Sequence, residues 1–163
     1  MKKNIFKIIL LIAGVTFWNG CNNYPIDEDG LLISERTDCY VGSFTLLDTD
    51  LQTIIVGNAY VDTLEQVIIA YVRFGAPIDN LWPQFSLGTD MKLSPKITSR
   101  IDFTLSKMNI EFTASEFGSD DLSKKIIADR AKFPSDALKY TVISGNRKIR
   151  KEYTILIVER KLQ

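Results

Sequence analysis

The chain has 163 residues, with 20 basic and 20 acidic side chains, and it contains two cysteines and no histidine. Without histidine, neither a Ser-His-Asp nor a Cys-His catalytic set can be built. The balanced charge shows no nucleic-acid footprint, so no nucleic-acid partner is expected. No cofactor is expected either.

Residues 1–20 have the pattern of a secretory signal. Lys2, Lys3 and Lys7 precede the apolar run at 8–17, and no acidic residue appears before Asp27. A basic segment followed by a short apolar one is typical of a signal peptide. The apolar run is about half the ~20 residues that a membrane-spanning helix needs, which favours a signal over a membrane anchor.

The signal is followed by Trp18-Asn19-Gly20-Cys21, which resembles the lipobox of bacterial lipoproteins. It departs from the usual pattern, which has Leu three residues and Ala or Ser two residues before the cysteine. The resemblance implies that Cys21 is the lipid attachment point, and stable anchoring then needs more than one acyl chain. The alternative is a buried cysteine that happens to follow a signal.

Acylation of Cys21 would leave Cys39 as the one free thiol, so no intramolecular disulfide is expected and a zinc site would lack paired thiolates as well as imidazole. Cys39 lies in an apolar run, where a cysteine most often packs as a small hydrophobe.

Residues 21–30 are expected to form the lipidated cysteine and a flexible acidic tether. Asp27, Glu28 and Asp29 follow one another there, and such a charge run is usually a solvated segment. It also resembles the acidic tract that exports Bacteroidetes lipoproteins to the outer face of the outer membrane. Without Lys2, Lys3 and Lys7 the mature chain would have 17 basic and 20 acidic residues, a formal charge of minus three.

Residues 31–163 are expected to form a single all-β domain, because short apolar segments alternate with turn residues. Within 81–87, Leu81, Pro83, Phe85 and Leu87 alternate with polar residues and Trp82, which predicts one buried and one wet face. The expected strands are 39–47, 53–61 with an interruption at Gly57 and Asn58, 66–74, 81–87, 100–105 and 109–113.

One segment has helical spacing instead. Ser119, Asp120 and Asp121 are suitable caps, apolar residues recur from Leu122 to Ile127, and Pro134 follows. We expect a helix of about three turns, ending near residue 131, that covers an edge or an end of the sandwich.

The last segments, 138–144 and 150–159, predict a β-hairpin around Gly145-Asn146, two residues that tolerate positive φ. Tyr153, Ile155 and Ile157 would then share one face. A basic cluster lies in and beside the turn (Arg147, Lys148, Arg150 and Lys151). It is interpreted as a solvated loop, with a binding patch as the alternative.

Two acidic pairs, Asp48/Asp50 and Asp120/Asp121, are the candidates for carboxylate chemistry. A glycosidase needs two acids about 5 to 9 Å apart across a cleft. Neither pair is followed by the glycine and terminal glutamate of an EF-hand loop. Turn and helix-cap roles are favoured for both.

Residues 74–87 (FGAPIDNLWPQFSL) and 140–158 (YTVISGNRKIRKEYTILIV) resemble an immunoglobulin-like domain family of Bacteroidetes surface lipoproteins. The resemblance implies an immunoglobulin-like β-sandwich in which 105–135 is an insertion bearing the helix. The family contributes framework residues and no catalytic ones. The matching residues are Gly75, Leu81, Pro83, Phe85, Tyr140, Thr141, Val142, Lys151, Tyr153 and Thr154.

Relatives of this kind often accompany outer-membrane systems that capture glycans, so the resemblance implies a non-enzymatic accessory or glycan-binding role at the cell surface. Trp82 is the candidate ligand-binding residue, extended by Tyr60 or Tyr71 if their strands lie alongside. Alternatively, the helical insertion covers Trp82. A structural or adhesive spacer that presents a partner protein is the second hypothesis, and a carboxylate-based hydrolase is the third.

Overall fold

The computed structural model describes residues 25–161. The expected signal at 1–20, the lipidation residue Cys21 and the start of the tether lie outside the described residues. The chain divides into two units, one ending at Ile33 and the other beginning at Ser34. None of the helices in the described part of the chain is long and apolar enough to span a bilayer.

The described part of the first unit contains a short turn. One carboxylate oxygen of Asp27 accepts hydrogen bonds from the backbone N–H groups of Asp29 and Leu31, at 3.0 and 2.9 Å. Ile26 and Leu32 form an isolated antiparallel bridge. The acidic run therefore has a local structural role, because its first carboxylate holds the turn.

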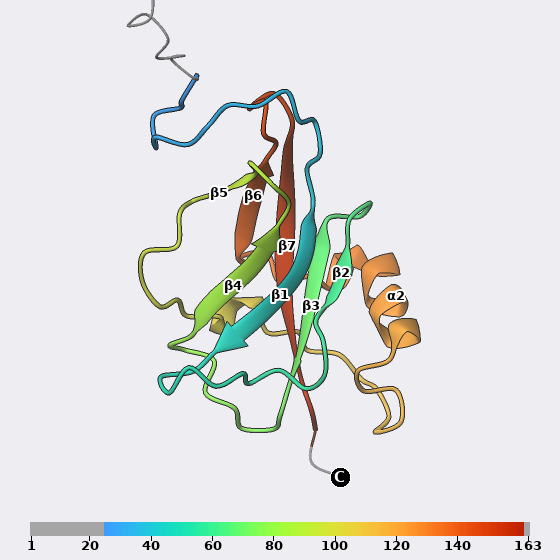
Figure 1. Ribbon diagram of the computed structural model, residues 1–163. Coiled ribbons are helices and arrows are strands. Elements are labelled where there is room, and N and C mark those ends of the chain that lie inside the picture. Colours follow the sequence, from blue (N-terminus) through green and yellow to red (C-terminus); the bar gives the residue numbers. More distant parts are fainter. Residues whose placement is uncertain (1–24, 162–163) are drawn as a thin grey trace, which may run out of the picture. The chain divides into compact units, whose positions relative to one another are not determined.

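The second unit contains two β-sheets and a helix (Figure 1). In the smaller sheet, β1 (Val41–Leu47) pairs antiparallel with β4 (Trp82–Leu87). The larger sheet has the strand order β2-β3-β7-β6-β5. The prediction of a mostly β, two-sheet sandwich with one helix is confirmed. The bounds of the larger sheet's strands are β2 Tyr60–Asp62, β3 Val67–Val72, β7 Arg150–Glu159, β6 Lys139–Ile143 and β5 Lys92–Ser94.

The centre of the larger sheet is a parallel pair. β3 runs parallel to β7 from the partners Val67 and Thr154 to Val72 and Glu159, whereas the other neighbours in this sheet are antiparallel. Every residue of β3 is buried. A strand covered on both faces has a continuous apolar sequence, which is why 66–74 is the strongest strand signal in the chain.

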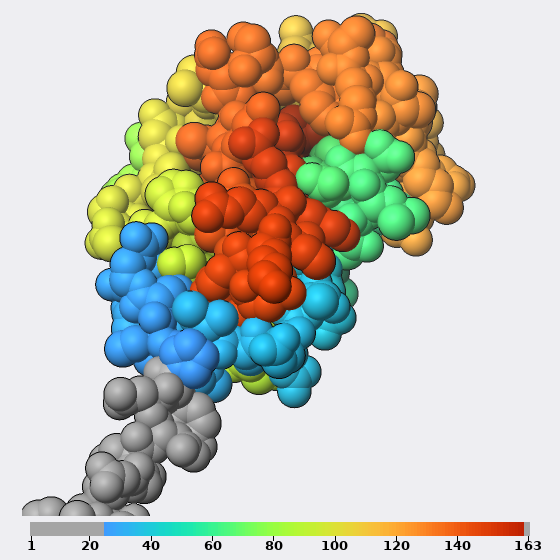
Figure 2. Space-filling model, turned by 90° about the horizontal axis from the view of Figure 1, so that it is seen from above, coloured from blue at the N-terminus to red at the C-terminus, as the bar shows by residue number. Residues whose placement is uncertain are grey.

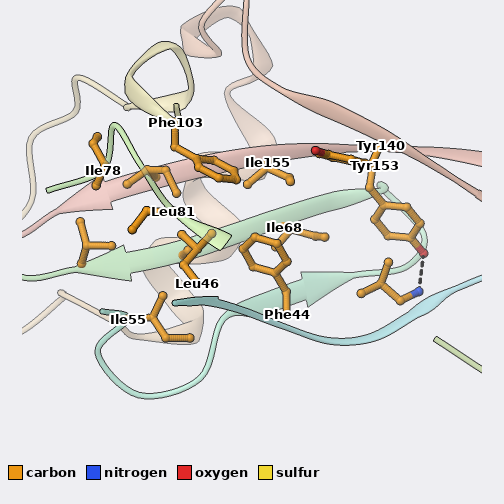
Figure 3. Packing of buried hydrophobic residues seen from close by; sticks show 14 of the residues in the cluster. Phe44, Leu46, Ile55, Ile68, Ile78, Leu81, Phe103, Tyr140, Tyr153 and Ile155 are labelled. Carbon is orange, nitrogen blue, oxygen red and sulfur yellow. Dashed lines mark hydrogen bonds between the residues drawn. The ribbon is translucent and has the colours of Figure 1, made fainter. Parts of the chain in front are cut away.

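One face of the larger sheet packs against the β1–β4 sheet and forms the main core. Ile68 from β3 and Ile155 from β7 meet Phe44 and Leu46 from β1 (Figure 3). Tyr153 is fully buried in this core, where its hydroxyl accepts a hydrogen bond of 3.4 Å from the backbone N–H of Val41. The predicted shared face of Tyr153, Ile155 and Ile157 is confirmed.

The opposite face of the larger sheet is covered by helix α2 (Asp120–Ala128). The apolar stripe of α2 packs on the side chains of β3 and β7 that point away from the main core. The expectation that the helix covers an edge or an end is therefore wrong, because an exposed apolar sheet face offers more area to bury. The contacting residues are Leu122, Ile126 and Ile127 on the helix and Val67, Ile69, Tyr71, Leu156 and Val158 on the sheet.

The helix begins at the expected residue and ends earlier than expected. The Ser119 side chain caps it by accepting from the backbone N–H of Leu122. The helix stops at Ala128, and a 3-10 turn, η3 (Arg130–Lys132), follows it. Asp129 is the C-cap, with φ −107° and ψ 64°, so the backbone leaves the helical region before Pro134.

Two of the expected strands, 100–105 and 109–113, do not form. Residues 100–105 contribute only an isolated bridge at Ile101 and then the 3-10 turn η2 (Thr104–Ser106), and residues 109–113 form no strand. Residues 53–61 have the expected interruption at Gly57, whose φ is +73°, with isolated bridges at Thr53 and Ile55 before it and β2 after it. β5 was not expected, because a three-residue strand leaves little periodicity to detect.

The β6–β7 turn forms as expected, with a different residue in the left-handed conformation. Arg147 has φ +62°, whereas Gly145 and Asn146 do not have positive φ. Glycine is needed at 145 for space, since a Cβ there would lie 2.4 Å from the Ser34 hydroxyl. Figure 2 looks onto this end of the domain and shows the hairpin in red.

Candidate functional site

Trp82 lies on the outward face of the small sheet, as the alternation within 81–87 predicts. Leu81 and Pro83 are buried, Gln84 and Ser86 are exposed, and Trp82 is half-buried. Phe85 points inward, with its ring centroid 4.9 Å from that of Phe44.

Pairing with β1 adds a second row of side chains to this face. Thr45 lies opposite Gln84, and Ser43 lies opposite Ser86. Directly opposed residues of an antiparallel pair point to the same side of the sheet, so hydroxyl and amide groups line the surface beside the indole. Ser43 and Thr45 were missed from the sequence because only the long-range pairing of β1 with β4 brings them to Trp82.

The face is hollowed around these residues. The hollow has a volume of about 440 Å³, within the range of small-ligand sites. Ile97, from the loop after β5, also lines it. No charged residue lines it. Its full lining is Ser43, Thr45, Trp82, Pro83, Gln84, Phe85, Ser86 and Ile97.

Most polar groups of the hollow have no partner within the described chain. The Thr45 hydroxyl is 3.1 Å from that of Thr53, where either group can donate. The side chains of Ser43, Gln84 and Ser86 make no hydrogen bond with any described residue. They are therefore available to a ligand.

The helical insertion does not cover this face. α2 packs on the other side of the larger sheet, so the β1–β4 sheet and the main core separate it from Trp82. The alternative in which Leu122 and Ile126 bury Trp82 is therefore wrong.

The tyrosines expected to extend the platform lie elsewhere. Tyr71 is 1% exposed beneath α2, and its hydroxyl is 2.8 Å from that of Ser123. Tyr60 is half-buried in β2 of the larger sheet and packs with the same cluster under α2. Neither tyrosine joins Trp82. Tyr71 lies on a central strand whose two faces are both covered. Its side chain points away from the main core, and it is nevertheless buried because α2 packs over that face.

The acidic pairs have the structural roles that were expected. The Asp48 carboxylate accepts from the backbone N–H groups of Asp50 and Gln52, at 2.8 and 2.9 Å, and so holds a turn. Asp120 and Asp121 lie in the first turn of α2, where negative charge suits the helix dipole. Among residues 25–161, no three His, Cys, Asp or Glu side chains are grouped as metal ligands.

The basic cluster is partly engaged in structure. The Arg147 guanidinium donates to the backbone carbonyls of Asp90 and Ser144, at 2.7 and 3.0 Å, and supports the turn. Lys151 donates to the carbonyl of Thr63 at 3.5 Å. Lys148 and Arg150 are exposed. These contacts favour the loop interpretation over a binding patch.

Cys39 is buried, and its thiol lies 3.2 Å from the carbonyl oxygen of Val142. Burial raises the pKa of this thiol above its ordinary value. The reactive thiolate is thereby disfavoured, which agrees with the packing role expected for Cys39.

Comparisons with known proteins add a distant structural likeness. No protein-family profile matches the chain, and no curated protein matches it. A crystal structure from Bacteroides thetaiotaomicron VPI-5482, of a protein provisionally assigned as a glycoside hydrolase, aligns with a TM-score of 0.46 and 16% identity. The alignment covers 80% of this chain and 28% of that protein. At this distance the likeness assigns neither a family nor an activity.

Proposed function

We propose that this protein is a non-enzymatic, glycan-binding surface lipoprotein. It is anchored in the outer membrane through Cys21, with its β-sandwich facing the cell exterior. The observation that supports glycan binding is the hollow on the outer face of the small sheet. There, one indole lies among hydroxyl and amide groups, and those of Ser43, Gln84 and Ser86 have no hydrogen-bond partner in the described chain.

Such a surface suits the chemistry of a sugar ring. A pyranose has an apolar C–H face and a rim of hydroxyls, so it can stack on an aromatic ring while its hydroxyls exchange hydrogen bonds with the surrounding side chains. Trp82 supplies the ring, and Ser43, Gln84 and Ser86 supply donors and acceptors. Sites that combine an apolar surface with a few placed polar groups are typical of small-ligand binding.

The framework residues within 74–87 and 140–158 support a finer proposal, that the sandwich is immunoglobulin-like. The parallel pairing of β3 with β7 departs from the two antiparallel sheets of that fold. An insertion at 105–135 that packs α2 over the larger sheet is compatible with the framework residues and with the parallel pairing of β3 and β7.

The test uses the full chain with Trp18→Phe, which leaves Trp82 as the only indole. Iodide should quench the fluorescence of Trp82, and a bound oligosaccharide should shift the emission and protect it from iodide. Trp82→Ala should lose retention on a glycan array. Phe74→Ala is the matched control, because Phe74 is an exposed aromatic residue, at 55%, that does not line this hollow.

The competing function is a spacer that presents a partner protein, and it gives a different result. A spacer would bind no glycan on the array, and Trp82→Ala would behave like Phe74→Ala. That outcome would remove the glycan-binding proposal.

A further inference from the structure

We infer that the ligand of the Trp82 hollow is an electrically neutral oligosaccharide rather than one bearing carboxylate or sulfate groups. The inference rests on the proposed function and specifies its substrate class.

The first observation is the chemistry of the lining. Its side chains are aliphatic, aromatic, hydroxyl and amide groups, and none is charged. Neither β1 nor β4 contains a charged residue over its whole length. The sheet therefore presents a neutral surface, although a quarter of the residues in the chain are charged.

The second observation concerns the charged side chains that lie nearest to the hollow along the chain, and the contacts that they make. Asp48 follows β1, and its carboxylate holds its own turn through two backbone N–H groups. Arg100 donates to the carbonyls of Asn80 and Thr49, at 3.4 and 3.2 Å. Lys96 precedes Ile97 and is exposed, and it does not line the hollow. None of these side chains is placed as a counter-ion inside the hollow.

The physical consequence is selectivity by charge. An anionic sugar seated on the half-buried indole would lose part of its hydration without gaining a cationic partner, and an unpaired charge is costly to desolvate. A neutral sugar loses only hydroxyl hydration, which Ser43, Gln84 and Ser86 can replace. Selection against charged ligands can thus arise without any repulsive group.

The experiment compares ligands of equal length on the full chain with Trp18→Phe. Neutral hexose hexasaccharides and oligogalacturonate of the same length are titrated while the emission of Trp82 is followed. The affinity for the neutral hexasaccharides should be at least about tenfold higher than that for oligogalacturonate, because the acidic ligand has no counter-ion in the hollow. The affinity for the neutral ligands should also be unchanged between about 50 and about 500 mM salt, since no ion pair is formed.

Two variants test the cause. Gln84→Lys places a cation in the hollow at an exposed position, and it should strengthen oligogalacturonate binding about tenfold in a salt-dependent manner. Lys96→Gln is the control beside the hollow, and it should leave the ratio of the two affinities unchanged.

The possible failures separate the two proposals. Equal affinity for neutral and acidic ligands, with both lost in Trp82→Ala, would overturn the neutral-ligand inference and leave glycan binding intact. A ratio that changes in Lys96→Gln would also overturn the inference, since the discrimination would then come from outside the hollow. Absence of binding for every glycan would remove the proposed function itself.

Discussion

At the scale of single residues, the buried polar groups that stabilise the fold of this domain are distinct from the polar groups of the Trp82 hollow. The hydroxyls of Tyr153 and Tyr71 are buried, and each has a partner. No buried side-chain nitrogen or oxygen in the described chain lacks a hydrogen-bond partner. The uncommitted groups of the Trp82 hollow are thus a surface feature, and ligand binding there need not disturb the core.

Tyr153 is the residue whose loss should cost most stability. Its ring is fully buried between the two sheets, so Tyr153→Ala should lower the free energy of unfolding by about 3 to 5 kcal/mol through lost burial and a cavity. Tyr153→Phe removes only the bond to the Val41 N–H and should cost about 1 kcal/mol. Urea denaturation followed by circular dichroism measures both.

Lys148→Ala is the surface control for that series. Lys148 is exposed in the β6–β7 turn, and its substitution should change stability by less than about 0.5 kcal/mol. Equal losses for Tyr153→Ala and Lys148→Ala would show that the core face of β7 is misassigned.

At the scale of elements, α2 and the two sheets form layers with separate apolar clusters. β3 and β7 contribute alternate side chains to each cluster, so the larger sheet is the layer that both share. The helix has a serine cap and an apolar stripe, but at nine residues it depends on the sheet for stability.

Ser119→Ala should destabilise this layer selectively. The serine hydroxyl satisfies the N–H of Leu122, and loss of such a cap costs about 1 kcal/mol. Hydrogen exchange of the α2 amides should become faster, while the amides of β1 and β4 should keep their protection. Ser119→Asp retains an acceptor and should restore the slow exchange. Uniform acceleration across both sheets would contradict the separate helical layer.

At the scale of the whole molecule, the second unit starts beside the β6–β7 turn. The N–H of Ser34 donates to the carbonyl of Gly145, and the N–H of Asn146 donates to the carbonyl of Arg36. β4 runs from Trp82 to Leu87, five residue steps and about 17 Å, and then leads through the turn at Asp90. Arg147 in the β6–β7 turn contacts the Asp90 carbonyl, so the Leu87 end of β4 is the end nearer to the start of the second unit. Trp82 lies at the opposite end of β4.

The anchor itself is open to a direct test. Cys21→Ala should abolish incorporation of a radioactive fatty acid and release the domain from the membrane fraction, because the acyl chains supply the attachment. Cys39→Ala is the control and should keep its label, since that thiol is buried. Persistent labelling of Cys21→Ala would contradict the lipoprotein proposal. Protease added to intact cells should remove the domain if it faces outward.

The sequence by itself determined what depends on near neighbours along the chain. The period of two within 81–87 placed Trp82, Gln84 and Ser86 on the face opposite Leu81 and Pro83. Ser119 and the apolar residues after it marked the start of α2, and the segments 138–144 and 150–159 marked the final hairpin. These features follow from local geometry, because side-chain direction in a helix or strand repeats over two to four residues.

Only the tertiary structure decided which faces are covered and which strands meet. Periodicity shows that Tyr71 points away from Ile68 and Ala70, but not that α2 packs over that second face and buries it. It places Thr45 on one side of β1, but the pairing with Gln84 that completes the hollow joins residues far apart in sequence. Such contacts depend on the burial of whole faces, a sum over many residues that no short segment contains.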